Sequence, residues 1–366
     1  MKNVFDVTDF GAVGDGVTDC TAAIQTALNK AGEAKGCVAV PPGKFMCGEL
    51  TVPPSVSLMG FSGWGYREYG GSILSLNDEN ADCLLNLTGA HGCRISGLQL
   101  LGGEVKKVGV CGIGVFWDNY DTRDNYELFK EENRYPEATQ EGFREDSFVI
   151  ENCQVKNFSG DGIHLQHMFA FTVKGCMIMA NGGNAIYLTG WDGWITDNIM
   201  HTNGGAAIYS DDNFSSFSIT GNRIEWNHNG GINVAFGGSL NINNNCFDRA
   251  YGPSVQTRGG KYRSNTITLT GNIFRRSGKY RHDFEEDPFL NSHILLNETD
   301  STVITANVFG VGKDDHDKGT PSPDYSVVLK NCGNCVVTSN SMVNGSLKQN
   351  TVVLGGKRNI IKDNAE

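Results

Sequence analysis

The sequence predicts an all-β protein: a right-handed parallel β-helix with three short strands per coil and an N-terminal capping helix. The main observation is a repeat between residues 148 and 250, where units such as FTVKGCMIMANGGNAIYLTGWD and GWITDNIMHTNGGAAIYSDDNF follow each other. Each unit has an alternating run, a small polar residue, a second apolar run, a Gly-rich corner and a third run. A fixed period of this size indicates stacked units that bury their apolar faces only against one another.

A small residue recurs at one place in the repeat, in steps of 23, 23, 24 and 23 residues, at Asn152, Gly175, Asn198, Asn222 and Asn245. Residues at one corner of successive coils stack ~4.8 Å apart, and Asn amides can bond along such a stack. We therefore expect an Asn ladder. An early coil has Gly97 at this position, and later coils continue it at Asn272, Asn307, Asn340 and Asn364. The wider spacing of the later members indicates insertions between coils.

Residues 5–46 predict a cap over the first coil. They begin with a strand and a Gly/Asp turn, and an amphipathic helix follows, with Thr18 or Asp19 as its N-cap. Its apolar stripe consists of Ala22, Ile24, Ala27, Leu28 and Ala31. A solenoid needs such a helix because its first coil otherwise leaves an open edge.

The segment FGAVGDGVTDCTAAIQTAL, followed by VAVPPGKF, closely resembles the N-terminal cap of the pectate-lyase-like β-helix superfamily. That superfamily includes polygalacturonases, certain glucanases, inulin fructotransferases and phage tail spikes. The resemblance covers essentially the whole chain and implies the β-helix fold. It implies no single activity, because members hydrolyse, eliminate, transfer or only bind.

Two families within this group can be compared residue by residue. Polygalacturonases carry an NTD run, a DD pair one coil later and a GHG run after that. Asp161 matches the first run, but residues 183–184 and 204–205 are Gly-Asn and Gly-Gly. Inulin fructotransferases and difructose-anhydride hydrolases have similar coils, but their acidic pair would fall at Cys176 and Tyr187. The resemblance therefore implies the scaffold of these families without their catalytic residues.

Composition limits the partners. The formal net charge is −11 and the pI is near 5.2, and such a field repels nucleic acid, anionic membranes and polyuronates. We therefore expect a neutral or cationic substrate, with no nucleic acid and no membrane as partner. The start MKNVFDVTDFG has no signal-peptide core, which favours a cytoplasmic protein, although removal of a signal peptide is the alternative.

The chain has 11 cysteines, which we interpret as small buried hydrophobic residues in a reducing compartment. Cys332 and Cys335 form the one CxxC pair. Without a second pair, two core cysteines at a turn are favoured over a zinc site. We expect no metal and no cofactor.

We expect one domain, residues 1–366, with loop insertions at 117–147, 275–292 and 310–326 on one side of the cylinder. The first insertion is acidic and aromatic, with a possible short helix at Tyr126–Arg134. Its aromatic residues favour a flap that stacks on sugar or on a neighbouring subunit, and a solvated loop is the alternative. They are Trp117, Tyr120, Tyr126 and Tyr135. A homotrimer is possible by analogy with the fold.

Period-2 alternation places one side-chain column on the outer face of the third strands: His164, Tyr187, Tyr209, Asn233 and Gln256. A second column contains Gln166, Thr189, Asp211 and Arg258, and His167, Gly190, Asp212 and Glu298 follow one step further. We expect Trp191 and Asp192 at the edge of this face, with a turn-shaping role of Asp192 as the alternative. Flat aromatic rings and amides together are typical of a saccharide-binding face.

Glycosidic bond cleavage usually needs two carboxyl groups about 5 to 9.5 Å apart, which carboxyls one or two coils apart provide. The catalytic candidates are Asp211, Asp212, Asp161 and Glu225. Asp211 or Asp212 is the first choice, since adjacent carboxylates resist simultaneous ionisation. Asp161 could instead cap a turn, Glu225 could pair with a turn amide, and His164 could bind substrate rather than act as a base.

These observations predict a glycoside hydrolase or transglycosylase that acts on a neutral oligo- or polysaccharide. One alternative is a lyase or epimerase with Arg258 or His164 as base beside a uronate, with Ca²⁺ as a possible partner. The other is a non-catalytic glycan-binding spike or assembly module.

Overall fold

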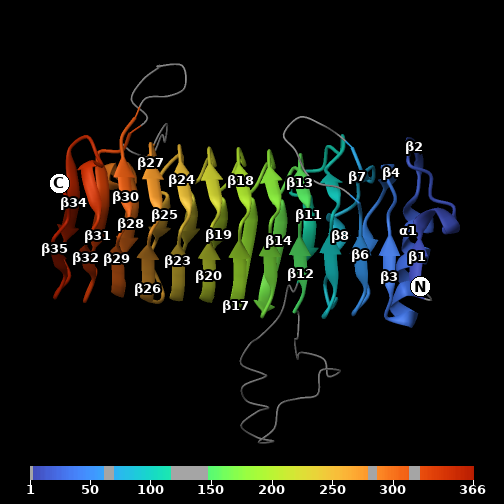
Figure 1. The fold of residues 1–366 in the computed structure, drawn as a ribbon, viewed down its shortest axis with the longest axis horizontal. Coiled ribbons are helices and arrows are strands. Elements are labelled where there is room, and N and C mark those ends of the chain that lie inside the picture. The colour runs from blue at the N-terminus through green and yellow to red at the C-terminus, as the bar shows by residue number, and fades with distance from the viewer. Residues whose placement is uncertain (1–2, 62–69, 117–146, 279–286, 313–321) are drawn as a thin grey trace, which may run out of the picture.

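The computed structural model describes residues 3–61, 70–116, 147–278, 287–312 and 322–366. It confirms the predicted fold class, a right-handed parallel β-helix. Figure 1 shows the strands in rows along one long axis, with the N-terminus at one end and the C-terminus at the other. The expected flap residues 117–146 and the expected helix at Tyr126–Arg134 lie outside the described residues.

Each coil contributes three strands to two hydrogen-bonded sheets, one of 23 and one of 12 strands within the described residues. In the larger sheet we distinguish a first-strand ladder and a third-strand ladder, which join where β17 runs from one into the other. The first-strand ladder comprises β1 (Val4–Asp6), β3 (Cys37–Ala39), β6 (Ser57–Met59), β9 (Arg94–Ser96), β12 (Val149–Glu151), β15 (Thr172–Lys174), β17 (Ile186–Thr196), β20 (Phe214–Thr220), β23 (Gly238–Asn243), β26 (Ser264–Thr270), β29 (Thr299–Thr305), β32 (Val336–Thr338) and β35 (Ile360–Lys362).

The third-strand ladder carries the predicted saccharide-binding face. It comprises β5 (Leu50–Thr51), β8 (Cys83–Asn86), β11 (Cys111–Val115), β14 (Ile163–Phe169), the start of β17, β19 (Ile208–Ser210), β22 (Ile232–Val234), β25 (Val255–Thr257), β28 (Ser292–Asn297), β31 (Tyr325–Lys330) and β34 (Gln349–Leu354). The 12-stranded sheet comprises β2 (Asp15–Asp19), β4 (Gly43–Cys47), β7 (Ser72–Leu76), β10 (Gln99–Leu101), β13 (Gln154–Lys156), β16 (Met177–Met179), β18 (Ile199–His201), β21 (Arg223–Glu225), β24 (Cys246–Asp248), β27 (Ile273–Arg275), β30 (Val308–Gly310) and β33 (Ser341–Asn344).

The N-terminal cap forms as predicted, with two corrections. After the 3-10 helix η1 (Val7–Phe10), helix α1 runs over Thr21–Ala34 and buries Ile24, Ala27, Leu28 and Ala31. Ala22 is exposed, so it does not belong to the stripe. The N-cap is Cys20, which makes no side-chain capping bond. Asp19 Oδ1 instead accepts the backbone N–H of Thr21 at 3.0 Å, because the chain enters the helix one residue later than expected.

The Asn ladder exists, but its three earliest predicted members, Gly97, Asn152 and Gly175, are wrong; Gly97 has a positive φ angle of 64°. Cys176 pairs in the coil stack with Asn198, whose Oδ1 accepts the N–H of Cys176 at 2.9 Å. Asn152 and Gly175 stand one position earlier and have positive φ angles of 52° and 62°. From Asn198 the side chains link one to the next, 2.9 to 3.1 Å apart, through Asn222, Asn245, Asn272, Asn307, Asn340 and Asn364. Each corner thus combines a left-handed residue with the ladder residue that follows it.

A second, shorter Asn ladder lines the Gly-rich corner and was not predicted. Asn181 Nδ2 donates to Asn203 Oδ1 at 3.0 Å, and Asn203 Nδ2 donates to Asn227 Oδ1 at 2.8 Å. All three residues are buried. The repeated Asn-Gly-Gly of residues 181–183 and 203–205 was the available signal. This ladder fixes the corner from which the third strands start.

The insertions do not all enter at one side of the third-strand ladder. The segment after β11 begins where a third strand ends, whereas the segments after β27 and β30 precede the third strands β28 and β31. The second and third insertions therefore both precede third strands, as expected, and the course of most of each insertion lies outside the described residues. Within the second insertion a short 3-10 helix, η3 (Pro288–Leu290), leads into β28.

All 11 cysteines are free, and nine of them are buried. This agrees with the interpretation of the cysteines as small core residues. Cys332 and Cys335 are both fully buried. Their thiols point to backbone carbonyls of the neighbouring coil, Leu296 O at 3.2 Å and Thr299 O at 3.7 Å, as expected for core residues at a turn.

Candidate active site on the third-strand ladder

The predicted first column is confirmed residue by residue. His164 pairs in register with Tyr187, Tyr187 with Tyr209, Tyr209 with Asn233, and Asn233 with Gln256. These strands are parallel and adjacent, so side chains about two dozen residues apart in sequence stand next to each other. Asn233 and Gln256 are buried, and the three rings are partly exposed.

The second column is irregular. In β14 the register shifts between Leu165 and Met168, so that Met168, not His167, pairs with Gly190. His167 has a φ of 52°, and its N–H donates to Thr189 Oγ1 at 2.8 Å. Thr189 is consequently buried rather than outward. Gln166 therefore has no simple counterpart in the next strand, and strict alternation fails at this end of β14.

Asp161 and His164 form a hydrogen-bonded pair at the start of the column. Asp161 Oδ2 lies 2.8 Å from His164 Nδ1. Asp161 Oδ1 accepts both the backbone N–H and the side-chain N–H of Asn184, at 2.6 and 2.9 Å. The side chains of Asp161 and His164 are 13% and 18% exposed, so the pair still reaches solvent. Three hydrogen bonds fix Asp161, and Asp161 fixes the His164 ring.

The imidazole of His164 lies in an aromatic stack. Its ring is parallel to that of Tyr187, with centroids 4.3 Å apart and an interplanar angle of 5°. Phe116 covers its other side at 5.4 Å. The Tyr187 hydroxyl donates to Asp211 Oδ1 at 2.7 Å. Burial, the hydrogen bond to Asp211 and nearby carboxylates raise the pKa of Tyr187 far above its ordinary value, which keeps this phenol protonated.

Arg258 closes the other end of the cluster. Its guanidinium lies 4.6 Å from the ring centroid of Tyr209. It donates to the carbonyl oxygens of Ser210 at 2.8 Å and of Asn233 at 3.1 Å, and also to Asn233 Oδ1. Burial lowers the pKa of Arg258 below its usual value. These contacts make Arg258 a support for Tyr209 and for the strand ends.

The remaining predicted residues lie around this cluster. Asp212 follows Asp211 and is exposed like it. Trp191 and Asp192 are partly exposed at the bend of β17, where Asp192 has a φ of 54°. Glu298 has a φ of 50°, and its Oε2 accepts the N–H of Gly260 at 3.0 Å. Asp192 and Glu298 therefore shape corners beside the face.

Glu225 does not belong to the site, so its prediction as a catalytic residue at this face is wrong. It ends β21 of the 12-stranded sheet, is 4% exposed and forms an ion pair with Arg223 at 2.6 Å. Next to it in register is Asp248, which Arg249 and Arg276 neutralise. The sequence repeat has three strands per unit, and Glu225 lies on the second. Its charge stabilises that sheet and is not presented to the third strands.

Three residues of the site were missed from the sequence: Phe116, Asn184 and Cys111. Ile113 and Ile163 are register partners, so CGIGV lies alongside DGIHL and Cys111 comes next to Asp161. This alignment was available in the sequence. The Cys111 thiol, an Asp161 oxygen and a His164 nitrogen all lie within 4.8 Å of one another. These are the residues of the site that could hold a metal ion.

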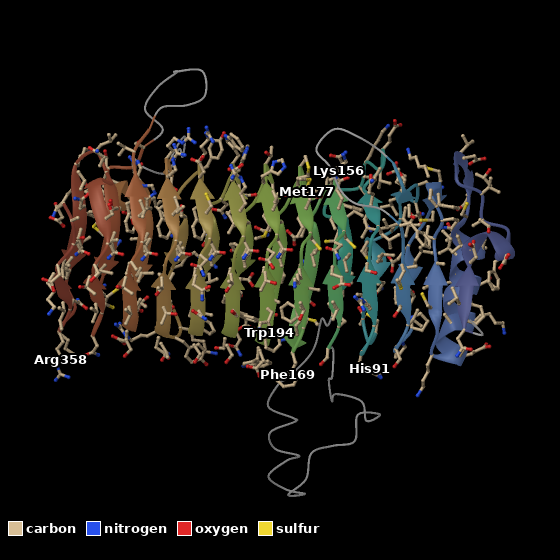
Figure 2. The ribbon with its side chains drawn as sticks, in the orientation of Figure 1. His91, Lys156, Phe169, Met177, Trp194 and Arg358 are labelled. Atoms are coloured by element: carbon tan, nitrogen blue, oxygen red, sulfur yellow. The ribbon has the colours of Figure 1, made fainter. Side chains whose placement is uncertain are left out.

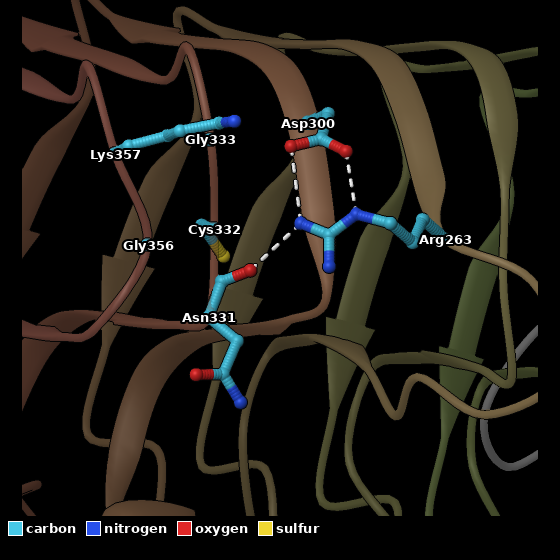
Figure 3. A pocket seen from close by; sticks show the side chains of 7 residues that line it. All are labelled: Arg263, Asp300, Asn331, Cys332, Gly333, Gly356 and Lys357. Carbon is cyan, nitrogen blue, oxygen red and sulfur yellow. Dashed lines mark hydrogen bonds and ion pairs between the residues drawn. The ribbon is translucent and has the colours of Figure 1, made fainter.

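A separate pocket of 530 Å³ lies near the C-terminal end, and no predicted site residue lines it. Figure 3 shows Arg263 reaching Asp300 with two hydrogen bonds, 2.6 and 3.0 Å long, and the carbonyl of Asn331 at 2.7 Å. Lys357 borders it. These bonds hold the guanidinium of Arg263, and they join three successive coils.

Within the described part of the chain, no helix has the length and apolar character needed to cross a bilayer.

Comparisons with known proteins agree with this fold. The family profile described as right handed beta helix region matches residues 170–310. The profile described as rhamnogalacturonase A/epimerase, pectate lyase-like matches residues 4–63, the predicted cap and first strands. A comparison with curated protein sequences gave no match.

Several solved structures superpose over nearly the whole chain. DFA-IIIase from Arthrobacter chlorophenolicus A6, without its lid and in complex with GF2, has a TM-score of 0.67, 14% identity and 99% coverage of both chains. The A-module of the Azotobacter vinelandii mannuronan C-5 epimerase AlgE6 gives 0.64 and 17%, with coverage of 99% of this chain and 98% of that one. PfbA, a surface adhesin of Streptococcus pneumoniae, gives 0.59 and 14%, with 97% and 93% covered.

At these identities the superpositions establish the fold and no more. The protein is a right-handed parallel β-helix whose N-terminal region is pectate-lyase-like.

Proposed function

We propose that this protein is a carbohydrate-active enzyme that cleaves or transfers a glycosidic bond of a neutral saccharide at the third-strand ladder. The observation that carries the proposal is one line of contacts along that face. Asp161 bonds to His164, His164 stacks on Tyr187, and Tyr187 bonds to Asp211. Acid–base chemistry on a sugar needs such a proton carrier beside a carboxylate.

The contacts suggest a role for each group. Asp161 is held by Asn184 and faces His164 Nδ1, so it positions the ring and supports an imidazolium. The ring's Nε2 is then the nitrogen that carries a proton toward substrate. The Tyr187 hydroxyl donates to Asp211, which supports Asp211 as a carboxylate. The two carboxylates thus have different roles. Asp161 acts through His164, whereas Asp211 acts directly on the substrate.

In the proposed reaction, protonated His164 gives its Nε2 proton to the glycosidic oxygen while the bond from that oxygen to the anomeric carbon breaks. The bonding electrons leave with the oxygen, and the Asp211 carboxylate faces the positive charge that develops on the sugar. Water, or a sugar hydroxyl in a transfer, then attacks the anomeric carbon and returns its proton to His164. The net products are two fragments, one of which carries a new reducing end, or a transferred glycoside.

The similar structures support a sugar ligand. DFA-IIIase was solved in complex with GF2, and the mannuronan epimerase is named for a polysaccharide. A net charge of −11 favours neutral sugars over polyuronates. The rings of His164, Tyr187 and Tyr209 are partly exposed. Because His164 and Tyr187 stack on each other, they offer a sugar their edges and polar atoms rather than an open ring face.

The test is product analysis on a panel of neutral oligosaccharides, including fructans, with the wild-type protein and with Asp161→Asn and Asp211→Asn. We expect new reducing ends or transfer products from the wild type and a loss of about 10² to 10⁴ in rate for either variant. Binding of a saccharide without any product would instead support a binding module. Full activity of both variants would place the chemistry elsewhere.

One observation favours elimination as a second candidate. The guanidinium of Arg258 places a cation on this face beside Tyr209, where it could hold a uronate carboxylate, and the Tyr187 phenol beside His164 offers a proton donor on the same face. A lyase would convert a uronate into an unsaturated product that absorbs in the ultraviolet. Such a product from polyuronate, with none from neutral sugars, would replace the first proposal.

A further inference from the structure

The contact between β11 and β14 brings three different donor atoms together. Cys111 begins β11, and Asp161 and His164 lie on the adjacent coil. The sulfur of Cys111, a carboxylate oxygen of Asp161 and a ring nitrogen of His164 are all within 4.8 Å of one another. Cys111 is only 4% exposed, while the other two side chains reach solvent. The cluster is thus closed on the core side and open toward solvent.

The Cys111 thiol lies 3.6 Å from the carbonyl oxygen of Gly109 and also beside the Asp161 carboxylate. Burial and the charge of Asp161 raise the pKa of Cys111 to about 12. A cation between the sulfur and the carboxylate would reverse this unfavourable interaction, because a metal binds the deprotonated thiol.

We propose that Cys111, Asp161 and His164 form a binding site for Zn²⁺. Thiolate, imidazole and carboxylate together are ligands that zinc accepts, with bonds of ~2.0 to 2.3 Å in a tetrahedral arrangement. Such bonds place neighbouring ligand atoms about 3.5 Å apart. Asp161 Oδ2 and His164 Nδ1, which lie 2.8 Å apart, have to separate to admit the ion. Water from the groove supplies the fourth ligand, as in zinc sites with three protein ligands.

Binding requires defined proton movements. The Cys111 thiol loses its proton to solvent, and the hydrogen bond between Asp161 Oδ2 and His164 Nδ1 opens so that both atoms face the metal. In a neutral imidazole the proton then resides on Nε2. About one proton is released for each zinc ion bound. Asn184 keeps its two bonds to Asp161 Oδ1 and acts as an outer partner that orients the carboxylate.

Bound zinc would block the proposed reaction, because it replaces the hydrogen bond between Asp161 Oδ2 and His164 Nδ1 on which that reaction relies. The first readout here is therefore spectroscopic, so that each of the two proposals can fail separately. Cobalt(II) titrated into the metal-free wild-type protein should bind one ion per chain and produce a near-ultraviolet thiolate-to-cobalt charge-transfer band, which zinc then abolishes. Calorimetry in buffers of different ionisation enthalpy should show the release of about one proton. If the wild type binds no cobalt, or binds it without this band, the proposal is overturned, whatever the variants do.

The variants assign the ligands. Cys111→Ser should remove the charge-transfer band, and His164→Gln should weaken affinity by more than the ~10- to 100-fold cost of losing an outer partner. Cys332→Ser is the matched control, because Cys332 is also a buried thiol but lies between β31 and β32, many coils after β11. Its band should equal that of the wild type. Persistence of the band in Cys111→Ser, or its loss in Cys332→Ser, would contradict the assignment.

Discussion

At the scale of single residues, Asp211 and Asp212 are adjacent and both exposed, yet they differ in contacts. Asp211 accepts a hydrogen bond from the hydroxyl of Tyr187, a member of the aromatic stack. Asp212 contacts Ser210 through its backbone instead: the carbonyl oxygen of Asp212 accepts a hydrogen bond from Ser210 Oγ at 3.3 Å. One carboxylate is therefore part of the ordered cluster, and its neighbour provides a matched comparison.

We expect Asp211→Asn to lower the turnover rate by about 10² to 10⁴ and Asp212→Asn to change it only a few-fold. Steady-state kinetics on the substrate found in the panel measures both. Thermal unfolding of the two variants controls for stability, since both positions are exposed. Equal losses in the two variants would show that the contact with Tyr187 does not select the catalytic carboxylate.

The buried imidazole of His293 should make the folded protein less stable in acid. It is fully buried between Phe274 and Phe309, and burial lowers its pKa to about 3 from an ordinary value of 6.5. Between these values the unfolded chain binds a proton that the folded chain does not. Stability is therefore lost as the pH falls from about 6.5 toward 3, by about 1.4 kcal/mol per pH unit from this residue.

Urea unfolding of wild type and His293→Leu across this pH range checks that expectation. The variant should lose less stability on acidification, whereas His91→Leu, at an exposed position, should follow the wild type. Parallel pH profiles for wild type and His293→Leu would contradict the assignment to His293.

At the scale of elements, the Asn ladder holds successive coils in register. Asn245 is 1% exposed, and its amide donates to Ile219 O at 2.9 Å and to Asn272 Oδ1 at 3.1 Å. Replacing it with Ala leaves buried backbone groups without partners, which should cost about 1 to 3 kcal/mol. Asn244→Gly is the control, because residue 244 has a φ of 52° and Gly accepts that angle. Denaturant unfolding that showed a larger loss for Asn244→Gly would contradict this division of roles.

The sequence predicted the strands and the first column well, because period-2 alternation and the coil period have a direct physical cause. It misplaced the ladder in early coils, because the left-handed residue and the ladder residue are adjacent and both are small. Asn152 precedes Cys153 just as Asp197 precedes Asn198. The shift in β14 was not predictable, since a register irregularity leaves no periodic signal.

The site was predicted in part for the same reason. Tyr187, Tyr209 and His164 follow from strand register, and the structure brings them together. Glu225 was assigned by residue type alone, and only the three-dimensional path shows that it lies on another sheet. The bonds of Asn184 to Asp161 come from a corner, where side-chain direction does not follow alternation.

At the scale of the whole molecule, the net charge affects which saccharides can approach the site. The chain carries a net charge of −11, so a polyuronate would be repelled at low ionic strength. We expect affinity for a neutral oligosaccharide to change little between low and physiological salt, and any affinity for polyuronate to rise with salt. Equilibrium binding at several salt concentrations measures this. Tight polyuronate binding that weakens with salt would contradict the expectation and favour the lyase.

Exposed aromatic residues elsewhere on the solenoid offer alternative surfaces on which a sugar can bind. Figure 2 shows Phe169 and Trp194 near the end of β14 and in β17, at the edge of the molecule. They are 43% and 49% exposed. A sugar could stack there without any reaction, so the location of a bound saccharide distinguishes a catalytic face from a mere binding surface.

The most direct measurement is a crystal structure of the Asp211→Asn variant with the best saccharide from the panel. The account predicts that a sugar ring lies against His164, Tyr187 and Tyr209, with a glycosidic oxygen within hydrogen-bonding distance of His164 Nε2. A saccharide bound only over Trp194, in the Arg263 pocket or on the 12-stranded sheet would contradict it.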